Sequence, residues 1–132
     1  MKTKFVLTAI ATTTLLAQSA PLLGHHSFAA EFDANQPVKL TGAVTKVEWV
    51  NPHIWFYVDV KDETGKITNW AWEMGSPNVL LRLGWTRNSL KPGQVVTVEG
   101  SRAKDGSNVA NARSVMLDGK RILAGSSQGV TP

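Results

Sequence analysis

Hydrophobic and polar residues alternate over most of the chain after residue 37, and a period of two is typical of β-strands that bury one face. In the first run the hydrophobic residues change parity between Gly42 and Val47, which predicts a bulge or strong bend there. Asp118 and Gly119 are expected to turn a short hairpin onto residues 121–123. The pattern predicts five main strands, over residues 38–49, 54–60, 67–74, 94–100 and 109–117.

One short helix is predicted between the third and fourth strands. Ser76 is placed to cap its start, Pro77 suits the first helical position, and Gly84 suits its end. Five strands with a helix at this point is the order of an OB-fold, a small Greek-key barrel. We therefore expect a mainly β protein with an OB-like barrel over residues 38–123. A five-stranded barrel of another topology and an open sandwich are alternatives, and the position of the helix favours the OB-like one.

The segments on either side of the predicted barrel are short. Phe28 and Phe32 are four residues apart, as on one face of a single helical turn, within an N-terminal segment over residues 25–37. A turn is expected over residues 33–37, because Asp, Asn and Pro favour turns. Residues 124–132 are small and polar, so we expect a flexible tail.

Residues 1–24 have the composition of a secretory signal peptide. A basic start precedes an apolar run over residues 5–16, and small residues then offer cleavage after Ala20 or Gly24. Cleavage after Gly24 would expose His25 and is favoured, because cleavage after Ala20 would leave a proline first. A membrane anchor is the alternative, but the run is shorter than the ~20 residues that span a bilayer. We expect a periplasmic or secreted protein with no membrane span in its mature form.

Composition narrows the function classes. The chain carries 14 basic and 10 acidic residues, and removing Lys2 and Lys4 with the signal peptide leaves 12 against 10. A net charge of +2 gives only weak electrostatic attraction to a polyanion, so nucleic acid is not expected as a partner. The absence of cysteine excludes disulfides and thiolate metal sites. The chain has no phosphate-binding glycine loop, nucleophile elbow or zinc-protease helix motif, so we expect a non-enzymatic protein without an assigned cofactor.

The candidate ligand face follows from the predicted fold. OB-folds bind ligands on the second and third strands and on the loops between strands one and two and strands four and five. If Ile54 and Phe56 point inward, the side chains on the other face of that strand point outward. A small molecule, saccharide or peptide could stack there, or the aromatic residues could instead pack beneath the N-terminal segment or the helix. The candidate ligand residues are Trp49, Asn51, His53, Trp55, Tyr57 and Lys104.

The third predicted strand raises the same question of core or surface. Trp70, Trp72 and Met74 share one face and are interpreted as core or rim residues. Glu73 and Asp59 could act as acid or base groups, but no spacing pairs them, so a solvated face is the preferred interpretation.

The three histidines suggest a competing function in copper binding or copper handling. A mature N-terminal His25 could chelate a metal through its amino group and imidazole, and His26 or His53 could complete the site. Nitrogen ligands suit Cu(II), and neutral imidazole is available near pH 7. Met74 and Met116 could add soft ligands for Cu(I), although a core role is the simpler interpretation. Three histidines in a chain can also be incidental.

Several motifs together resemble a family of small exported bacterial proteins that is catalogued only as a domain of unknown function. The resemblance extends from His25 to about Leu123 and implies a secreted OB-like protein whose mature region begins at the histidine pair, with no activity to transfer. A structural role beside a partner in an envelope complex is a further alternative. The motifs are residues 25–33 (HHSFAAEFD), 49–53 (WVNPH), 72–77 (WEMGSP), 84–86 (GWT), 90–93 (LKPG) and 102–107 (RAKDGS).

Overall fold

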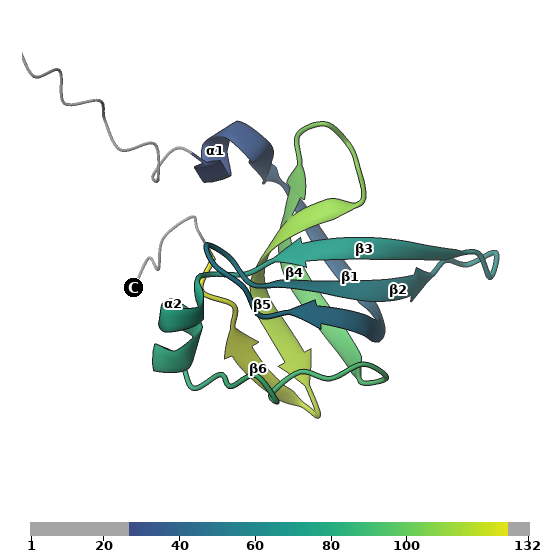
Figure 1. The fold of residues 1–132 in the computed structure, drawn as a ribbon. Coiled ribbons are helices and arrows are strands. Elements are labelled where there is room, and N and C mark those ends of the chain that lie inside the picture. The colour runs from purple at the N-terminus through teal and green to yellow at the C-terminus, as the bar shows by residue number, and fades with distance from the viewer. Residues whose placement is uncertain (1–26, 127–132) are drawn as a thin grey trace, which may run out of the picture.

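The computed structural model describes residues 27–126 and shows a mainly β protein with two short helices (Figure 1). The helix between the third and fourth strands is present as predicted. The predicted signal peptide over residues 1–24 lies outside the described residues. In chain order the elements are α1 (Ser27–Glu31), β1 (Phe32–Glu48), β2 (Trp55–Lys61), β3 (Ile67–Glu73), α2 (Pro77–Arg82), β4 (Val95–Ala103), β5 (Val109–Leu117) and β6 (Lys120–Leu123).

The strands form one sheet in the order β3-β2-β1-β4-β5-β6, and β3 also pairs with β5. That extra pairing is parallel and joins Ala71 to Val109, whereas the neighbouring strands pair antiparallel. The pairings therefore run from β1 through β2, β3, β5 and β4 back to β1. This circuit, with α2 between β3 and β4, agrees with an OB-like architecture. The sheet has six strands, because the short hairpin expected after Asp118 forms β6.

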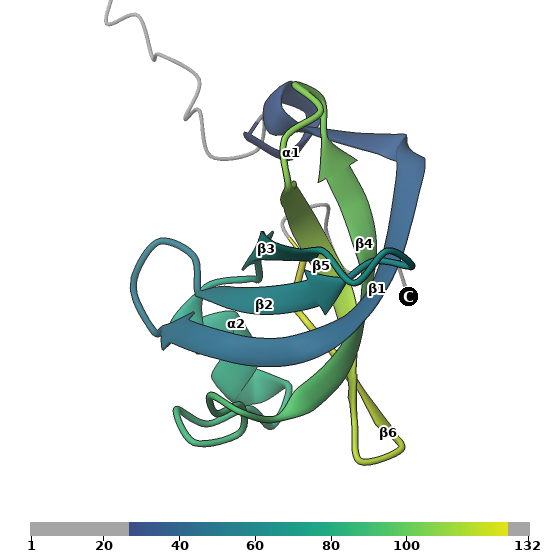
Figure 2. The same ribbon diagram turned by 90° about the vertical axis from the view of Figure 1, so that its right-hand side faces the viewer.

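β1 bends strongly, so one strand serves two neighbours (Figure 2). Its first part pairs with β4 and its last part pairs with β2, and the register against β2 shifts between Val44 and Lys46. This shift confirms the bulge that the change of parity predicts. Gly42 permits the close crossing, because a Cβ there would lie 2.1 Å from the carbonyl oxygen of Asp59.

The N-terminal boundary differs from the sequence prediction. β1 begins at Phe32, and Phe32 pairs with Ala103, so the strand starts before the expected turn rather than after it. The turn chemistry is still present, because the register against β4 shifts between Phe32 and Pro37 and Asn35 N donates to Asp33 Oδ1 over 2.9 Å. The segment over residues 33–37 is thus an irregularity within β1.

The interior confirms the predicted orientation of β2 and β3. The side chains of Ile54, Phe56 and Val58 are fully buried, and so are Trp72 and Met74. The Trp72 ring stacks on Phe56 with 6.4 Å between ring centroids. The apolar side of the second and third strands therefore forms the main core, as their alternation predicts.

The C-terminal segment is packed where a flexible tail was expected to begin. Ala124 and Gly125 are buried, and the Gly75 N–H donates to the Ala124 carbonyl over 2.8 Å. The indole of Trp85 donates to the carbonyl of Leu123 over 2.7 Å. These contacts attach the chain after β6 to the region of α2. Residues 127–132 of the predicted tail lie outside the described residues.

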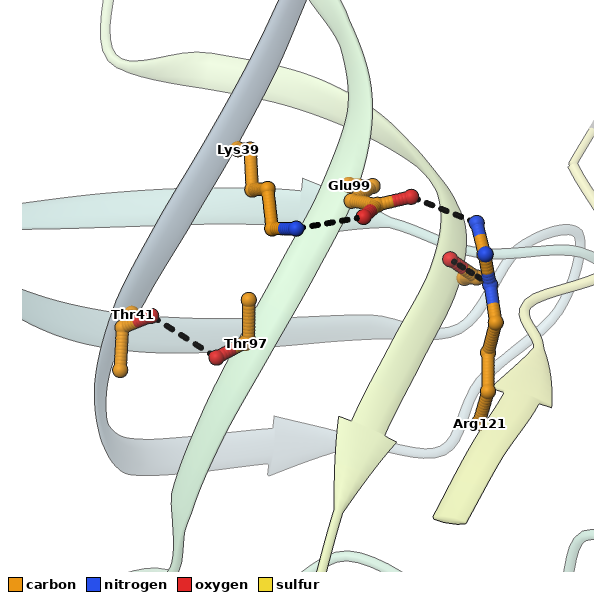
Figure 3. Close-up of polar contacts among 6 residues, drawn as sticks. Lys39, Thr41, Thr97, Glu99 and Arg121 are labelled. Carbon is orange, nitrogen blue, oxygen red and sulfur yellow. Dashed lines mark hydrogen bonds and ion pairs between the residues drawn. The ribbon is translucent and has the colours of Figure 1, made fainter. Parts of the chain in front are cut away.

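A polar network covers the outer face of β1, β4 and β6 (Figure 3). Lys39 and Arg121 both bind the carboxylate of Glu99, at 3.1 and 2.5 Å, and the hydroxyls of Thr41 and Thr97 lie 2.8 Å apart. The pKa of Glu99 is lowered, chiefly by the hydrogen bond from Lys39. Because Lys39 and Arg121 are more than half exposed, these ion pairs contribute little to stability. Within residues 27–126, no helix has the length and apolar character needed to cross a bilayer.

Candidate ligand-binding site

An open pocket of about 350 Å³ lies between α1, β2 and the loop joining β4 to β5. Trp55 and Lys104, which the sequence nominates as ligand residues, both line it. They come from the second strand and from the β4–β5 loop, the two places that OB-folds commonly use for ligands. The complete lining is Ala30, Glu31, Phe32, Trp55, Ala103, Lys104, Asp105, Ser107 and Val109.

α1 forms one wall of this pocket and is attached through a small hydrophobic cluster. Phe28 and Phe32 lie 5.7 Å apart between ring centroids, and both are buried with Ala103 against Val109. The backbone N–H of Lys104 also donates to the carbonyl of Glu31 over 2.9 Å. In both ribbon views α1 sits beside the β4–β5 loop (Figures 1 and 2). The sequence therefore predicts the helical turn and the proximity of the two rings, although Phe32 itself is the first residue of β1.

Trp55 supplies the aromatic surface of the pocket. It opens β2, pairs with Glu73 of β3, and is half-buried because its strand neighbours Ile54 and Phe56 take the interior positions. The alternative interpretation, in which the N-terminal segment covers Trp55, is only partly confirmed. α1 lines the pocket together with Trp55, and the indole remains partly exposed.

Charged groups of both signs surround the aromatic surface. The ammonium of Lys104 donates to the carbonyl of Ala29 in α1. Asp105 Oδ1 accepts from the backbone N–H of Ser107 over 2.9 Å, and hydrogen bonds from Ser107 lower the pKa of Asp105. The Glu31 carboxylate is exposed and makes no hydrogen bond or ion pair with the described residues.

Arg102 holds the β4–β5 loop in place. Its guanidinium donates to the carbonyls of Ser107 and Gly106, at 3.1 and 2.5 Å, and lies 5.3 Å from the centre of the Trp70 ring. A loop fixed in this way presents its side chains to a ligand at a lower ordering cost.

Tyr57 shares the outer face of β2 with Trp55 but does not line the pocket. Its hydroxyl donates to Glu48 Oε2 over 3.1 Å, and the Lys46 ammonium binds the same carboxylate at 2.5 Å. Lys46 also lies 5.5 Å from the centre of the Tyr57 ring. Burial, followed by the hydrogen bond to Glu48, raises the pKa of Tyr57. The Tyr57 side chain is therefore engaged within the protein.

The loop between β1 and β2 contributes nothing to the lining of this pocket. Trp49 is half-buried, with the Arg87 guanidinium 5.9 Å from its ring centre, and Asn51 is exposed beside a cis Asn51–Pro52 peptide. The structure thus brings together Trp55 and Lys104 of the nominated residues, while Trp49, Asn51, His53 and Tyr57 lie outside the pocket lining.

The prediction that Glu73 lies on a solvated face is wrong. Glu73 is 5% exposed, accepts a 3.0 Å hydrogen bond from the Asn111 amide, and lies 3.5 Å from His53 Nδ1. Asn111 in turn accepts from the Ser126 hydroxyl. Glu73 is buried because β5 and the chain after β6 pack over the end of β3, and these segments are distant from Glu73 in the sequence.

The copper hypothesis stays a prediction. His25 and His26 lie outside the described residues, and His53 has the buried Glu73 as its carboxylate neighbour. Among residues 27–126 there is no group of three or more histidine, aspartate or glutamate side chains placed to hold a metal ion.

The pocket residues that the sequence did not nominate include Glu31, Phe32, Asp105 and Ser107. Asp105 and Ser107 lie in the loop expected between the fourth and fifth strands, so the sequence predicts where they lie along the chain but not which residues they contact. The N-terminal residues could be found only from the pairing of Phe32 with Ala103, which joins positions far apart in the sequence.

Comparison with one solved structure, that of Rim1, supports the fold assignment. The mitochondrial single-stranded DNA binding protein Rim1 from S. cerevisiae matches with a TM-score of 0.50 and 10% identity, over 63% of this chain and 93% of that one. The N-terminal domain of PriB from Thermoanaerobacter tencongensis matches with a TM-score of 0.43 and 21% identity, over 63% and 96% of the two chains. No curated protein matches the sequence.

These comparisons correct one expectation and establish the family. The exclusion of nucleic acid as a partner is wrong, because a single-stranded DNA binding protein has a similar fold and a small net charge does not exclude that class of ligand. The family model described as a family of unknown function, DUF6152, matches residues 12–112. The chain therefore belongs to this family of unknown function.

Proposed function

We propose that this protein is an exported, non-enzymatic binding module with an OB-like barrel, and that its ligand places one flat ring against Trp55. The observation that carries this proposal is the pocket itself, in which Trp55 from β2 meets Lys104 from the β4–β5 loop. OB-folds use these two regions to bind oligonucleotides and oligosaccharides.

The size and lining of the pocket support a ring-sized ligand. Its volume of about 350 Å³ is at the lower end of the range of ~300–1,000 Å³ for small-molecule sites. The lining combines the apolar residues Phe32, Ala103 and Val109 with charged residues. Small-molecule sites are usually lined by apolar residues together with a few polar groups.

Single-stranded nucleic acid is a second candidate, and the fold likeness to Rim1 favours it. A base could stack on Trp55, since stacking on aromatic side chains is a general mode of single-strand binding. Binding of this kind should weaken steeply as salt rises, because backbone phosphates release counterions. Binding of an uncharged ring should depend little on salt.

The proposal is tested with Trp55→Leu and the matched control Trp49→Leu, which alters a half-buried tryptophan outside the pocket. Binding of the oligonucleotide dT10, chitotriose and a Gly-Phe-Gly peptide is measured by calorimetry at low and high salt. We expect at least one probe to bind the parent and the control with similar affinity. Its affinity for Trp55→Leu should be lower by about tenfold or more, because ring stacking is lost. Equal binding by both variants, or no binding by the parent at millimolar probe, contradicts the proposal.

A further inference from the structure

The charges around Trp55 indicate the chemical class of the ligand. The polar residues that line the pocket are the acidic Glu31 and Asp105, the basic Lys104 and the hydroxyl-bearing Ser107. A charged ligand of either sign would meet a like charge in this small space. An uncharged ligand with hydroxyl groups meets no such repulsion and can use donors and acceptors alike.

The hydrogen-bonding state of these groups sharpens the inference. The Lys104 ammonium already donates to the Ala29 carbonyl, and one oxygen of Asp105 already accepts from Ser107 N. The Glu31 carboxylate makes no hydrogen bond or ion pair with the described residues. Each ionised carboxylate has about four lone-pair positions and no donor, so the groups still open at the pocket are mainly acceptors. The ligand must therefore bring hydrogen-bond donors to a flat aromatic surface.

We propose that the ligand is a saccharide, with the C–H face of one sugar ring on Trp55 and ring hydroxyls donating to Glu31 and Asp105. This inference rests on the proposed function and names its ligand. A nucleobase or a phenylalanine side chain would also stack on the indole, but neither carries several adjacent hydroxyl donors. Hydrogen bonds to ionised carboxylates are stronger than those between neutral groups, so Glu31 should contribute measurably to affinity.

The experiment uses an array of neutral glycans covering common hexose and N-acetylhexosamine linkages, with dT10 and tyramine as a polyanion and a cationic ring. Calorimetry of the best array glycan is then repeated with Glu31→Gln and Trp55→Leu. The matched control is Glu63→Gln, an exposed carboxylate in the β2–β3 hairpin. We expect one or more glycans to bind with an affinity that depends little on salt. Glu31→Gln should lower that affinity roughly tenfold, and Glu63→Gln should leave it unchanged.

The other outcomes separate the two proposals. If dT10 or tyramine binds in a Trp55-dependent manner and no glycan does, the saccharide inference is overturned and the ring-binding module stands. If glycans bind equally to the parent and to Glu31→Gln, the assigned hydroxyl contact is wrong. If no probe of any class depends on Trp55, both proposals fail.

Discussion

Tyr57 is the chain's only tyrosine, and its neighbours show how a side chain on the outer face of a strand can still be tied into the protein. Its hydroxyl binds Glu48, whose carboxylate also binds Lys46. The pKa of Glu48 is lowered, first by the hydrogen bond from Lys46, so Glu48 is ionised at neutral pH. A charged acceptor beside a partly buried phenol favours the protonated phenol.

The pKa of Tyr57 should be measurable directly by absorbance near 295 nm, because no other tyrosine contributes. We expect a midpoint above the ordinary value of ~10 in the folded protein, with burial as the main cause and Glu48 as the second. Glu48→Gln should lower the midpoint, and Glu63→Gln should leave it unchanged. A midpoint at or below that of the denatured chain would contradict this environment.

The same shift predicts how stability depends on alkaline pH. A folded pKa above the unfolded one means that this contribution to stability is complete below the unfolded pKa of ~10 and is lost as pH rises through the folded pKa. Denaturant melts from pH 8 to 11 should show this loss in the parent, and a smaller loss in Tyr57→Phe. An identical alkaline slope in both proteins would be inconsistent with it.

At the scale of the elements, close contacts between strands decide where substitutions are tolerated. The β4–β5 pairing has a bulge between Glu99 and Gly100, where the chain lies against the carbonyl of Asn111. A Cβ at Gly100 would come within 1.9 Å of that oxygen, so only glycine fits without a shift of the backbone.

Gly100→Ala should therefore destabilise the fold by about 1–3 kcal/mol, the usual cost of overpacking. Val95→Thr is the matched control, since Val95 is on the same strand and 63% exposed. Denaturant unfolding followed by tryptophan fluorescence measures both. Equal stability of the two variants would mean that the β4–β5 bulge lacks this close contact.

α1 is the element whose attachment matters most for the pocket. Lys104→Met removes the ammonium that donates to the Ala29 carbonyl while keeping most of the side-chain length. Hydrogen exchange of the amides over residues 28–31 should become faster. Lys120→Met, at the exposed first residue of β6, should have no effect there. Unchanged exchange in Lys104→Met would show that the hydrophobic contacts of Phe28 and Phe32 alone hold α1.

Local patterns predicted more of the elements than of their contacts. Alternation located the strands and the inward side of β2, and the change of parity predicted the bend in β1, because these depend on neighbouring residues. The start of β1 and the burial of Glu73 were not predicted, since they depend on Ala103 and Asn111, which are distant in the sequence. For the same reason, the sequence identified Trp55 and Lys104 but not Glu31 as parts of one pocket.

At the scale of the whole molecule, the pocket depends on three distant parts of the chain, residues 30–32, Trp55 and residues 103–109. The circuit of strands brings them together, because β1 pairs with both β2 and β4. A ligand that contacts all three parts binds only the folded protein. Ligand binding should therefore raise the melting temperature as its concentration rises above the dissociation constant.

Amide and indole chemical shifts can show whether the ligand binds at Trp55. The labelled protein is titrated with the tightest-binding glycan of the array, or with dT10 if no glycan binds. We expect shifts of the Trp55 indole and of amides over residues 30–32 and 103–109, with the buried indoles of Trp72 and Trp85 unchanged. Shifts confined to the polar network around Lys39, Thr97 and Glu99, with Trp55 unaffected, would show that the ligand binds elsewhere.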